Sequence, residues 1–473
     1  MTDSYFETER FRALLDEYEE CERQGKPCIV SSDEYADFAE YYQEKGMEEK
    51  ALHAVQQALD LYPGAVGPLV FAARYALTRE NDVEKAAAYA EQIEDKSDLE
   101  YLYIMGEILL FKGQVADADI YFEEETDSVS DDDLDDYYLD VATIFADYDC
   151  IEEAERWFDR CEETDSPDYL ELYGRILFGK GFFDEGEKVM NHLLDGNPYN
   201  SNYWNILATA HFQHGNIEEA IDSSEYSIAI NPNDDEALLT KAHSLFVLGN
   251  YEQAMVFYER FNKLRSSAES HLQVAHCLMA LERYEEGIDH LREAEKKAQN
   301  NPALLLEIYQ EIAYMLVYLG QLDQAINYME KTETLDCDHE EMLVVKGHLY
   351  LTSGYLSEAQ QCFERAIVET NNQGKIFLRV ASSVYDNGYK ELAYRMLRLL
   401  KDTDIQDNYA GYSYFVLCFY HDKDKHYFMK FLRKLTQENP TEARAMLFEI
   451  FPDDLTPDEY CNYAEEHIVG DWK

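Results

Sequence analysis

The chain has few basic residues, few prolines and no long hydrophobic run. Its 40 lysines and arginines accompany 97 acidic residues over 473 positions, so the formal net charge is −57. Phosphate binding requires clustered Lys and Arg, and we therefore expect neither a nucleic acid partner nor an anionic membrane surface. The most hydrophobic run, from Tyr412 to Tyr420, has nine residues, whereas a membrane-spanning helix needs about 20.

Cysteine patterns and targeting signals are also missing from the sequence. The nine cysteines are scattered and include no Cys-x-x-Cys pair, which argues against a disulfide framework or a zinc ribbon. The first residues, from Met1 to Glu7, contain neither the basic nor the apolar segment of a signal peptide. Hydrophobic residues make up 46% of the chain, which is enough for a folded core. We therefore expect a soluble, cytoplasmic protein.

A repeated motif is the strongest positive feature. The pattern Gly-x-x-x-x-Ala occurs at Gly215–Ala220, Gly249–Ala254, Gly320–Ala325 and Gly354–Ala359. Alignment on this motif predicts twelve units with a mean spacing of about 34 residues. The units are predicted to begin near Ser32, Val66, Leu99, Asp135, Pro167, Ser201, Asp235, Ala268, Leu306, Glu340, Gly374 and Asn408.

Two positions within the unit are almost always small. Position 8 is Ala or Gly in the first eleven units and position 20 in ten of them, as in Ala208 and Ala220. Apolar residues at positions 4, 7, 8 and 11 form one stripe of a helix, and Gly at position 15 of eight units supplies a left-handed C-cap. We predict two helices per unit that approach closely at the small residues. A large residue at position 24, such as Phe122 or Phe363, is expected to fill the space beyond.

This pattern resembles the tetratricopeptide repeat. The unit Ser201–Asp234 carries the family's register most completely, with Trp204, Leu207, Ala208, Gly215, Ala220 and Pro232. The resemblance implies an all-α, right-handed superhelical solenoid of about twelve helix–turn–helix units with helical caps. We expect an N-terminal capping helix in residues 1–31 and the array in residues 32–441. The last unit is degenerate, with Phe415 at its small position, and residues 442–473 are expected to form C-terminal capping helices, including one near Glu459–Val469.

The resemblance also implies a ligand groove. In this family, positions 2, 5, 9, 12 and 13 line the concave surface, and here they combine apolar, aromatic and polar side chains suited to a peptide. The candidate groove residues are Asn205, Thr209, Phe212, His243, Phe246, His276, Met279, Tyr314, Tyr318, His348 and Leu351. The first and fifth units add acidic residues to this stripe, among them Glu40 and Glu171. The alternative, that the stripe is packed against neighbouring units, stays open at this point.

Charge is unevenly distributed along the array. Residues 101–200 hold 28 acidic and 6 basic side chains, whereas residues 351–450 hold 13 of each sign. An acidic half favours a basic partner. A solvated, solubilising face explains the same pattern without any partner.

Three stretches imitate chemical motifs. Gly174–Gly181 approaches a P-loop, but Gly181 replaces the hydroxyl residue and the stretch falls on a predicted helix. His211 and His214 lack further zinc ligands nearby. A polar cluster between His421 and His426 is interpreted as an exposed turn rather than a metal site. We predict no metal, no cofactor and no catalytic residue.

The sequence therefore favours a non-enzymatic adaptor or scaffold that binds a peptide segment or a partner protein in the concave groove. The alternative is an assembly factor that acts through its convex face or C-terminal cap, with self-association. A regulator with an unrecognised ligand or catalytic site is the least favoured hypothesis. The oligomeric state is left open.

Overall fold

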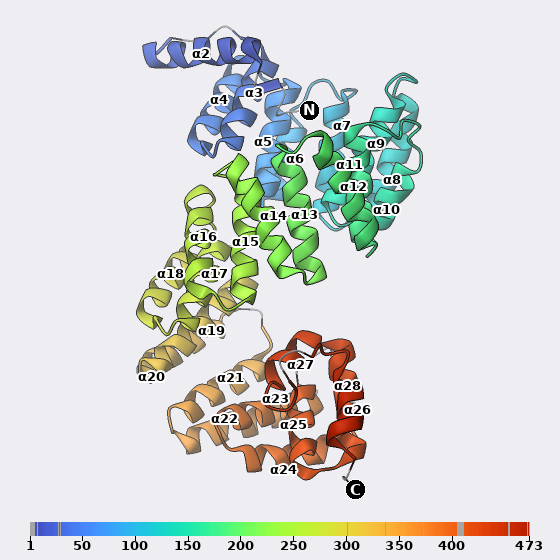
Figure 1. Ribbon diagram of the computed structural model, residues 1–473. Helices are drawn as coiled ribbons and strands as arrows, with labels where there is room; N and C mark the ends of the chain where they lie inside the picture. The colour runs from blue at the N-terminus through green and yellow to red at the C-terminus, as the bar shows by residue number, and fades with distance from the viewer. Residues whose placement is uncertain are drawn as a thin grey trace. The chain divides into compact units, whose positions relative to one another are not determined.

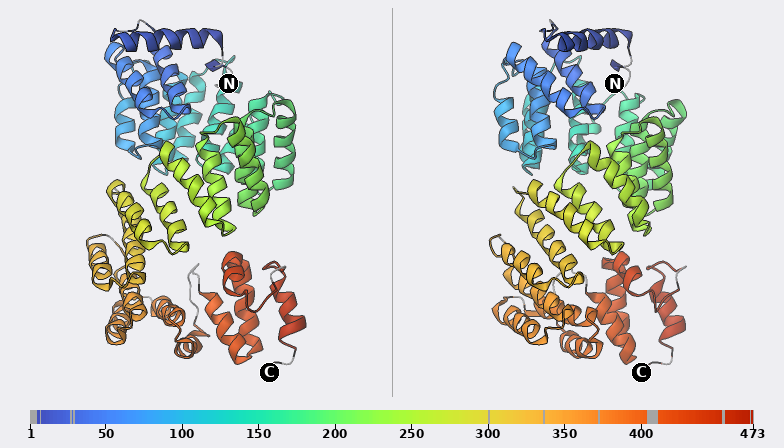
Figure 2. Two further views of the ribbon diagram at one scale, coloured as in Figure 1. Left: turned by 60° about the vertical axis from the view of Figure 1, so that its left-hand side comes forward. Right: turned by 90° about the vertical axis from the view of Figure 1, so that its left-hand side faces the viewer.

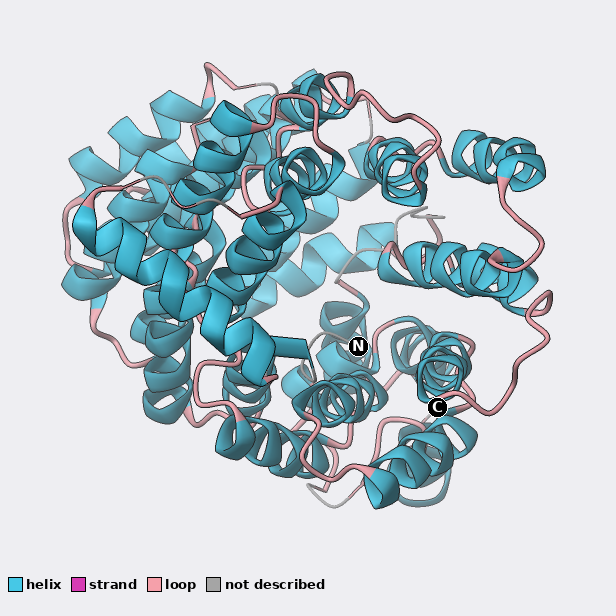
Figure 3. Ribbon diagram, turned by 90° about the horizontal axis from the view of Figure 1, so that it is seen from above, coloured by secondary structure: helices cyan, strands magenta, loops and turns pink. Residues whose placement is uncertain are grey.

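The computed structural model describes residues 5–6, 8–26, 28, 30–299, 301–335, 337–371, 373–403, 411–452, 455–470 and 472. Within these residues the only regular secondary structure is helical, with no strand, and loops and turns join successive helices (Figure 3). The helices fall into two compact units, Met1–Ser266 and Ser267–Lys473 (Figure 1). The predicted all-α helical repeat is confirmed.

The first unit opens with α2 (Glu9–Gln24), which Thr8 caps by accepting from the backbone N–H of Phe11. Seven helix pairs follow among its described residues, and η1 (Thr126–Ser128) extends the third pair. The pairs are α3 (Ser32–Glu44) with α4 (Glu48–Leu61), α5 (Val66–Thr78) with α6 (Val83–Ala90), α7 (Leu99–Phe111) with α8 (Val115–Glu125), α9 (Leu134–Asp147) with α10 (Ile151–Phe158), α11 (Pro167–Gly179) with α12 (Phe183–Gly196), α13 (Ser201–His214) with α14 (Ile217–Ile230), and α15 (Asp235–Val247) with α16 (Tyr251–Leu264).

The second unit contains five pairs and a C-terminal cap among its described residues. The pairs are α17 (Ala268–Ala280) with α18 (Tyr284–Lys297), α19 (Pro302–Tyr318) with α20 (Leu322–Thr332), α21 (His339–Thr352) with α22 (Leu356–Glu369), α23 (Gln373–Asp386) with α24 (Lys390–Leu400), and α25 (Tyr412–Asp422) with α26 (Lys425–Glu438). The cap consists of α27 (Pro440–Met446), α28 (Tyr460–Tyr463) and η2 (Ala464–Ile468). In both views of Figure 2 the helices of each unit lie side by side in pairs.

Most predicted unit starts coincide with observed first helices. Seven match to the residue, and three more lie within one residue of the observed start. The start near Leu306 is wrong, because α19 begins at Pro302. Asn301 caps the helix by accepting from the N–H of Leu304, and Pro302 occupies the first helical position. The start at Asn408 lies outside the described residues.

Each turn inside a pair places one residue in the left-handed region. The eight glycines at position 15 all have positive φ. Where glycine is missing, Asn81, Asp149, Glu282 and Lys423 adopt φ values of 55° to 57° in its place. The turn geometry is therefore kept throughout the described pairs, even in the degenerate twelfth unit, at a conformational cost that glycine avoids.

The small residues at position 8 make room for the large residue at position 24 of the same unit. An added Cβ on Gly106 would lie 1.9 Å from the ring of Phe122, and one on Gly347 would lie 2.5 Å from the ring of Phe363. Ala208 and its position-20 partner Ala220 are fully buried. The predicted close approach of the two helices is confirmed.

The C-terminal cap differs from the predicted single helix near Glu459–Val469. α28 ends after four residues, and the wider turn η2 follows. In this turn the N–H of Val469 donates to the carbonyl of Ala464 at 2.9 Å. The wider turn lets Ala464 and Val469, five residues apart, both be buried in the core formed with α25 and α26.

The first unit turns back on itself. One guanidinium nitrogen of Arg265, just after α16, donates to the carbonyl of Thr78 at the end of α5, at 3.0 Å. A second contact joins the same pairs, because Arg79 lies 3.8 Å from the carboxylate of Asp235 on α15. The seventh pair of this unit therefore meets the second pair and closes one superhelical turn.

Candidate binding cavity of the first unit

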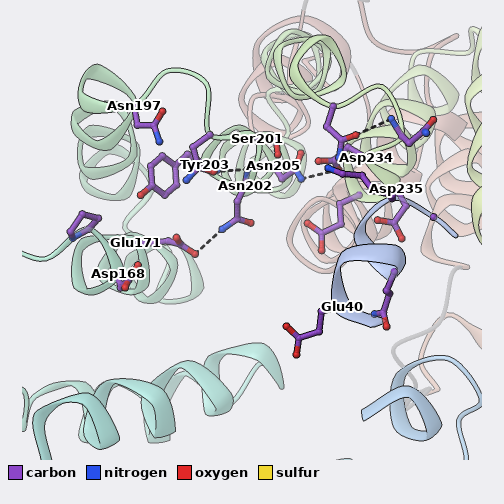
Figure 4. Close-up of a pocket in the computed structure, with 18 of the residues that line it drawn as sticks. Glu40, Asp168, Glu171, Asn197, Ser201, Asn202, Tyr203, Asn205, Asp234 and Asp235 are labelled. Carbon is purple, nitrogen blue, oxygen red and sulfur yellow. Dashed lines mark hydrogen bonds between the residues drawn. The ribbon is translucent and has the colours of Figure 1, made fainter. Parts of the chain in front are cut away.

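Closure of this turn encloses a cavity of about 1480 Å³ in the first unit. The first residues of α11, α13 and α15 line one side, and α3 and α5 line the other. Figure 4 shows side chains from these elements pointing into the shared space, with Glu40 of α3 apart from the residues of α11 and α13. The cavity is therefore built from residues more than a hundred positions apart in the sequence.

Carboxylates dominate the electrostatics of this cavity; Glu171 is half-buried, whereas Glu40 and Glu236 are exposed. Burial raises the pKa values of Glu40, Glu171 and Glu236 above their ordinary value. For Glu236 the negative charges of Asp234 and Asp235 add to this effect. These carboxylates reach water, yet the surrounding protein limits their hydration, so ionisation costs more than on an open surface.

Asparagine side chains link the lining helices. The Nδ2 amide of Asn202 donates to Oε1 of Glu171 at 2.9 Å, which joins α13 to α11. The Nδ2 amide of Asn205 donates to Oδ1 of Asp234 at 2.9 Å. Figure 4 shows both hydrogen bonds.

Asp234 is a buried junction of this network. Besides the amide of Asn205, its carboxylate accepts from the N–H of Ala237 at 3.0 Å and from the hydroxyl of Ser227 at 3.2 Å. It thereby caps α15 and fixes the orientation of Asn205. Asn205 itself is 5% exposed, and its Oδ1 has no hydrogen-bond partner.

Two of the three Lys or Arg residues that line the cavity already form ion pairs. Nε of Arg74 lies 2.9 Å from Glu107, and its Nη1 lies 3.1 Å from Glu100. Arg79 is paired with Asp235. The arrangement can therefore accept positive charge and hydrogen-bond donors from a ligand.

The structure distributes the predicted groove residues of the first unit over two environments. Asn205 lines the cavity, whereas Thr209, Phe212, His243 and Phe246 do not. His243 packs edge-on against Tyr258 with ring centroids 5.5 Å apart, and burial lowers its pKa. Phe246 packs against Tyr251, and Phe212 lies 6.0 Å from His243. Packing against neighbouring helices thus uses much of this stripe.

The predicted residues of the second unit are also partly engaged in packing. Nδ1 of His348 lies 3.0 Å from the hydroxyl of Ser383, and its ring lies edge-on to Tyr314. Tyr318 is 60% exposed and stacks on Tyr284. His276 is half-buried, Met279 packs against the core of α17 to α21, and Leu351 packs against the core of α21 to α24.

Most lining residues were not among the predicted groove residues, and three of them belong to the polar network of the cavity. Asn202 and Glu236 occupy position 2 of their units, a position that the repeat register assigns to the groove. Asp234 ends the preceding unit, and only its place as a helix N-cap signals a role. Glu40 and Glu171 were in the acidic part of the predicted stripe, and both line the cavity.

Two of the stretches that imitate chemical motifs pack as parts of the repeat. Gly174 lies within α11, where an added Cβ would meet Met190 at 2.8 Å, and Gly181 forms the turn of the pair with a φ of +80°. His211 and His214 pack against Phe183. Within the described residues, no three His, Cys, Asp or Glu side chains converge to form a metal site. None of the described helices has the length and apolar character that crossing a membrane requires.

Family models match several parts of the chain. Tetratricopeptide repeat models match residues 173–235, 306–336 and 340–367. A model for subunit 3 of the anaphase-promoting complex, or cyclosome, matches residues 224–294. These repeats support a protein-interaction scaffold in general.

Two relatives of known identity resemble part of the chain. BBSome complex member BBS4 of Bos taurus is 22% identical over 183 residues, which cover 38% of this chain and 34% of that protein. Outer dynein arm-docking complex subunit 4 of Mus musculus is 27% identical over 103 residues, which cover 22% of this chain and 16% of that protein. The chain therefore spans about a third or less of the length of these relatives.

A tetratricopeptide repeat protein from Parabacteroides merdae has a crystal structure that aligns with a TM-score of 0.38 at 19% identity. This alignment covers 53% of our chain and 98% of that protein. The three segments matched by tetratricopeptide repeat models fall on helix pairs of the described residues, namely α11 to α14, α19 with α20, and α21 with α22. The chain is a tetratricopeptide repeat protein.

Proposed function

We propose that the chain is a non-enzymatic scaffold whose first unit binds an extended segment of a partner protein in the cavity between α3, α5, α11, α13 and α15. The cavity itself is the observation that carries this proposal. Its volume of about 1480 Å³ exceeds the several hundred to about 1,000 Å³ typical of small-molecule sites. It therefore suits a chain segment better than a single metabolite.

The chemistry of the lining supports a peptide ligand. An extended peptide has backbone N–H and C=O groups that must be paired when they leave water. Asn202 and Asn205 present amides on one helix of the cavity wall, and an amide can both donate and accept. Phe71 and Leu264 add apolar contact surface. This combination matches what a peptide groove requires.

A peptide-display selection tests the proposal. The full chain is used to select binders from a random peptide library, and their Kd values are measured by fluorescence polarisation. Asn202→Trp places a large ring at the cavity wall and should abolish binding of the selected peptides. Asp222→Trp, an exposed substitution on α14 outside the cavity, is the matched control and should bind as the wild type does. Selected peptides that bind both variants equally would contradict the proposal.

The predicted stripe is the second candidate site, and the same peptides test it. A variant that combines His243→Ala, Phe246→Ala and His276→Ala removes the polar and aromatic groups of this stripe. Loss of binding in this variant, but not in Asn202→Trp, would assign the ligand to the stripe. Binding that survives both variants would favour the convex face or the C-terminal cap.

The relatives favour a role inside a larger assembly. Both relatives and one family model are named as members of multi-subunit complexes. We infer a scaffolding subunit whose partner is a protein rather than nucleic acid, since the net charge of −57 repels phosphates. The scattered cysteines fit a reducing, cytoplasmic location.

A further inference from the structure

The cavity of the first unit carries excess negative charge. Nine Asp or Glu residues and three Lys or Arg residues line it. Two of these three cations already have carboxylate partners, because Arg74 is paired with Glu100 and Glu107, and Arg79 with Asp235. The protein itself therefore neutralises little of the negative charge in this space.

Three carboxylates of the lining form no close ion pair. More distant cations act on them and favour their charged form, Arg74 on Glu40 and Arg175 on Glu171 and Glu236. In the described part of the chain, no Lys, Arg or His lies within 4.0 Å of the carboxylate oxygens of Glu40, Glu171 or Glu236. They come from α3, α11 and α15, so they approach the cavity from different helices. A ligand that places cations between these helices would gain attraction in a space where water screens charge less than on an open surface.

Asn205 gives a second, independent indication of a ligand. The residue lines the cavity and is only 5% exposed, and its Oδ1 accepts no hydrogen bond. The orientation is not free, since its Nδ2 is held by Asp234. An acceptor that is buried and unpaired costs free energy until a donor reaches it.

We propose that the ligand of this cavity is a basic protein segment, whose arginine or lysine side chains pair with Glu40, Glu171 and Glu236 while one of its N–H groups donates to Oδ1 of Asn205. This inference rests on the proposed function, because it names the chemistry of the segment bound there. Arginine fits best, since a planar guanidinium offers five donors and can bridge carboxylates on neighbouring helices.

Because the whole chain is strongly negative, the test needs a matched control. Any cationic peptide is attracted to a protein of net charge −57. The test therefore compares Glu171→Gln/Glu236→Gln with Glu218→Gln/Asp222→Asn on the exposed face of α14. Both double variants remove two negative charges, but only the first pair lines the cavity.

The probes are short peptides that alternate glycine with arginine, lysine or glutamate, used beside the peptides from the display selection. At about 0.15 M NaCl, where the Debye length is about 8 Å, distant surface charges are largely screened. We expect enrichment of arginine and lysine among the selected peptides. Glu171→Gln/Glu236→Gln should weaken their binding by about tenfold or more, and the control Glu218→Gln/Asp222→Asn by less than about twofold.

The cavity variant also carries its own folding control. Neutral side chains at 171 and 236 remove carboxylates that are costly to ionise, so the melting temperature should stay level or rise while affinity falls. A loss of binding with unchanged or higher stability cannot come from misfolding. The glutamate peptide should not bind.

The outcomes separate this inference from the proposed function. Two results would overturn the basic segment and leave the cavity as the site. The first is that the selected peptides are uncharged. The second is that they bind Glu171→Gln/Glu236→Gln with wild-type affinity but do not bind Asn202→Trp. Equal weakening by both double variants would reduce the effect to general attraction and overturn the inference. If spermine displaced the arginine peptide as effectively as an unlabelled copy of that peptide does, the assignment of the ligand as a protein segment would be overturned. Indifference to Asn202→Trp would contradict the proposed function itself.

Discussion

The Cα of Gly106 faces the ring of Phe122 so closely that a Cβ at residue 106 would lie 1.9 Å from Cζ of that ring. Phe122 cannot retreat easily, because it is fully buried among Tyr137, Phe145 and Trp157. This contact shows physically why position 8 of the unit stays small. The backbone of the first helix forms one wall of the pocket that holds the ring of the second helix.

We predict that Gly106→Ala lowers the free energy of unfolding by about 1–3 kcal/mol, because overpacking outweighs the gain in helix propensity of about 1 kcal/mol. Gly196→Ala at the end of α12 is the control, since nothing lies within 4 Å of its added Cβ. Urea unfolding measures both variants. In a double-mutant cycle, Phe122→Leu should cost less in the Gly106→Ala background than in the wild type. Strict additivity would contradict the proposed clash.

A second prediction concerns pH and Glu311 on α19. Burial, with the neighbouring charge of Glu307, raises the pKa of Glu311 to about 7, and its Oε2 has no hydrogen-bond partner. The unfolded chain releases this proton near the ordinary pKa of 4.5, below the folded one. The folded state therefore loses stability as pH rises from about 4.5 to about 7.

We expect Glu311→Gln to raise the free energy of unfolding by about 1–2 kcal/mol at pH 8, after allowance for partial solvent screening, and to have little effect near pH 4. Unfolding by urea at several pH values measures the difference. Glu330→Gln removes an exposed carboxylate from the same unit and serves as the control. A gain of equal size at all pH values would rule out ionisation of Glu311 as the cause.

A third prediction separates a buried helix cap from an exposed one. Asp234 caps α15 and also accepts from Asn205 and Ser227, whereas Asp82 caps α6 by accepting from Lys85 at the surface. Asp234→Ala should cost roughly 2–4 kcal/mol, since it removes the cap and leaves the amide of Asn205 without its acceptor. Asp82→Ala should cost only about 1 kcal/mol. Similar losses in both variants would mean that the buried network adds nothing to the cap.

The repeat register could be read from the sequence because each of its rules acts locally. Ala208 must be small for its own pair, and Gly215 must end its own helix, so the period repeats without reference to distant residues. The start of α19 was missed because the register was counted from a period, while Asn301 and Pro302 set the helix start by their own capping chemistry.

The cavity could be foreseen only in part. The stripe positions predicted Asn205, Glu40 and Glu171, but whether stripe residues face a cavity or a neighbouring helix depends on superhelical closure. That closure rests on contacts such as Arg265 with Thr78, 187 positions apart in the sequence. His243 and Phe246 share the stripe yet pack against Tyr258 and Tyr251. Local periodicity carries no information about such distant contacts.

A final prediction concerns salt. The net charge of −57, with 28 acidic and 6 basic residues in 101–200, means that like charges repel throughout the folded chain. Folding brings these charges closer together, so repulsion destabilises the folded state more than the unfolded state. Raising NaCl from about 0.01 M to about 0.15 M shortens the Debye length from about 30 Å to about 8 Å. Each kcal/mol of screened repulsion should raise the melting temperature by about 2–4 °C for units of this size.

Calorimetry with NaCl measures the shift in melting temperature, and an equal osmolality of a neutral solute is the control. A melting temperature that stays flat over this range would show that ion pairs such as Arg74 with Glu107, which salt weakens, contribute as much as the net repulsion.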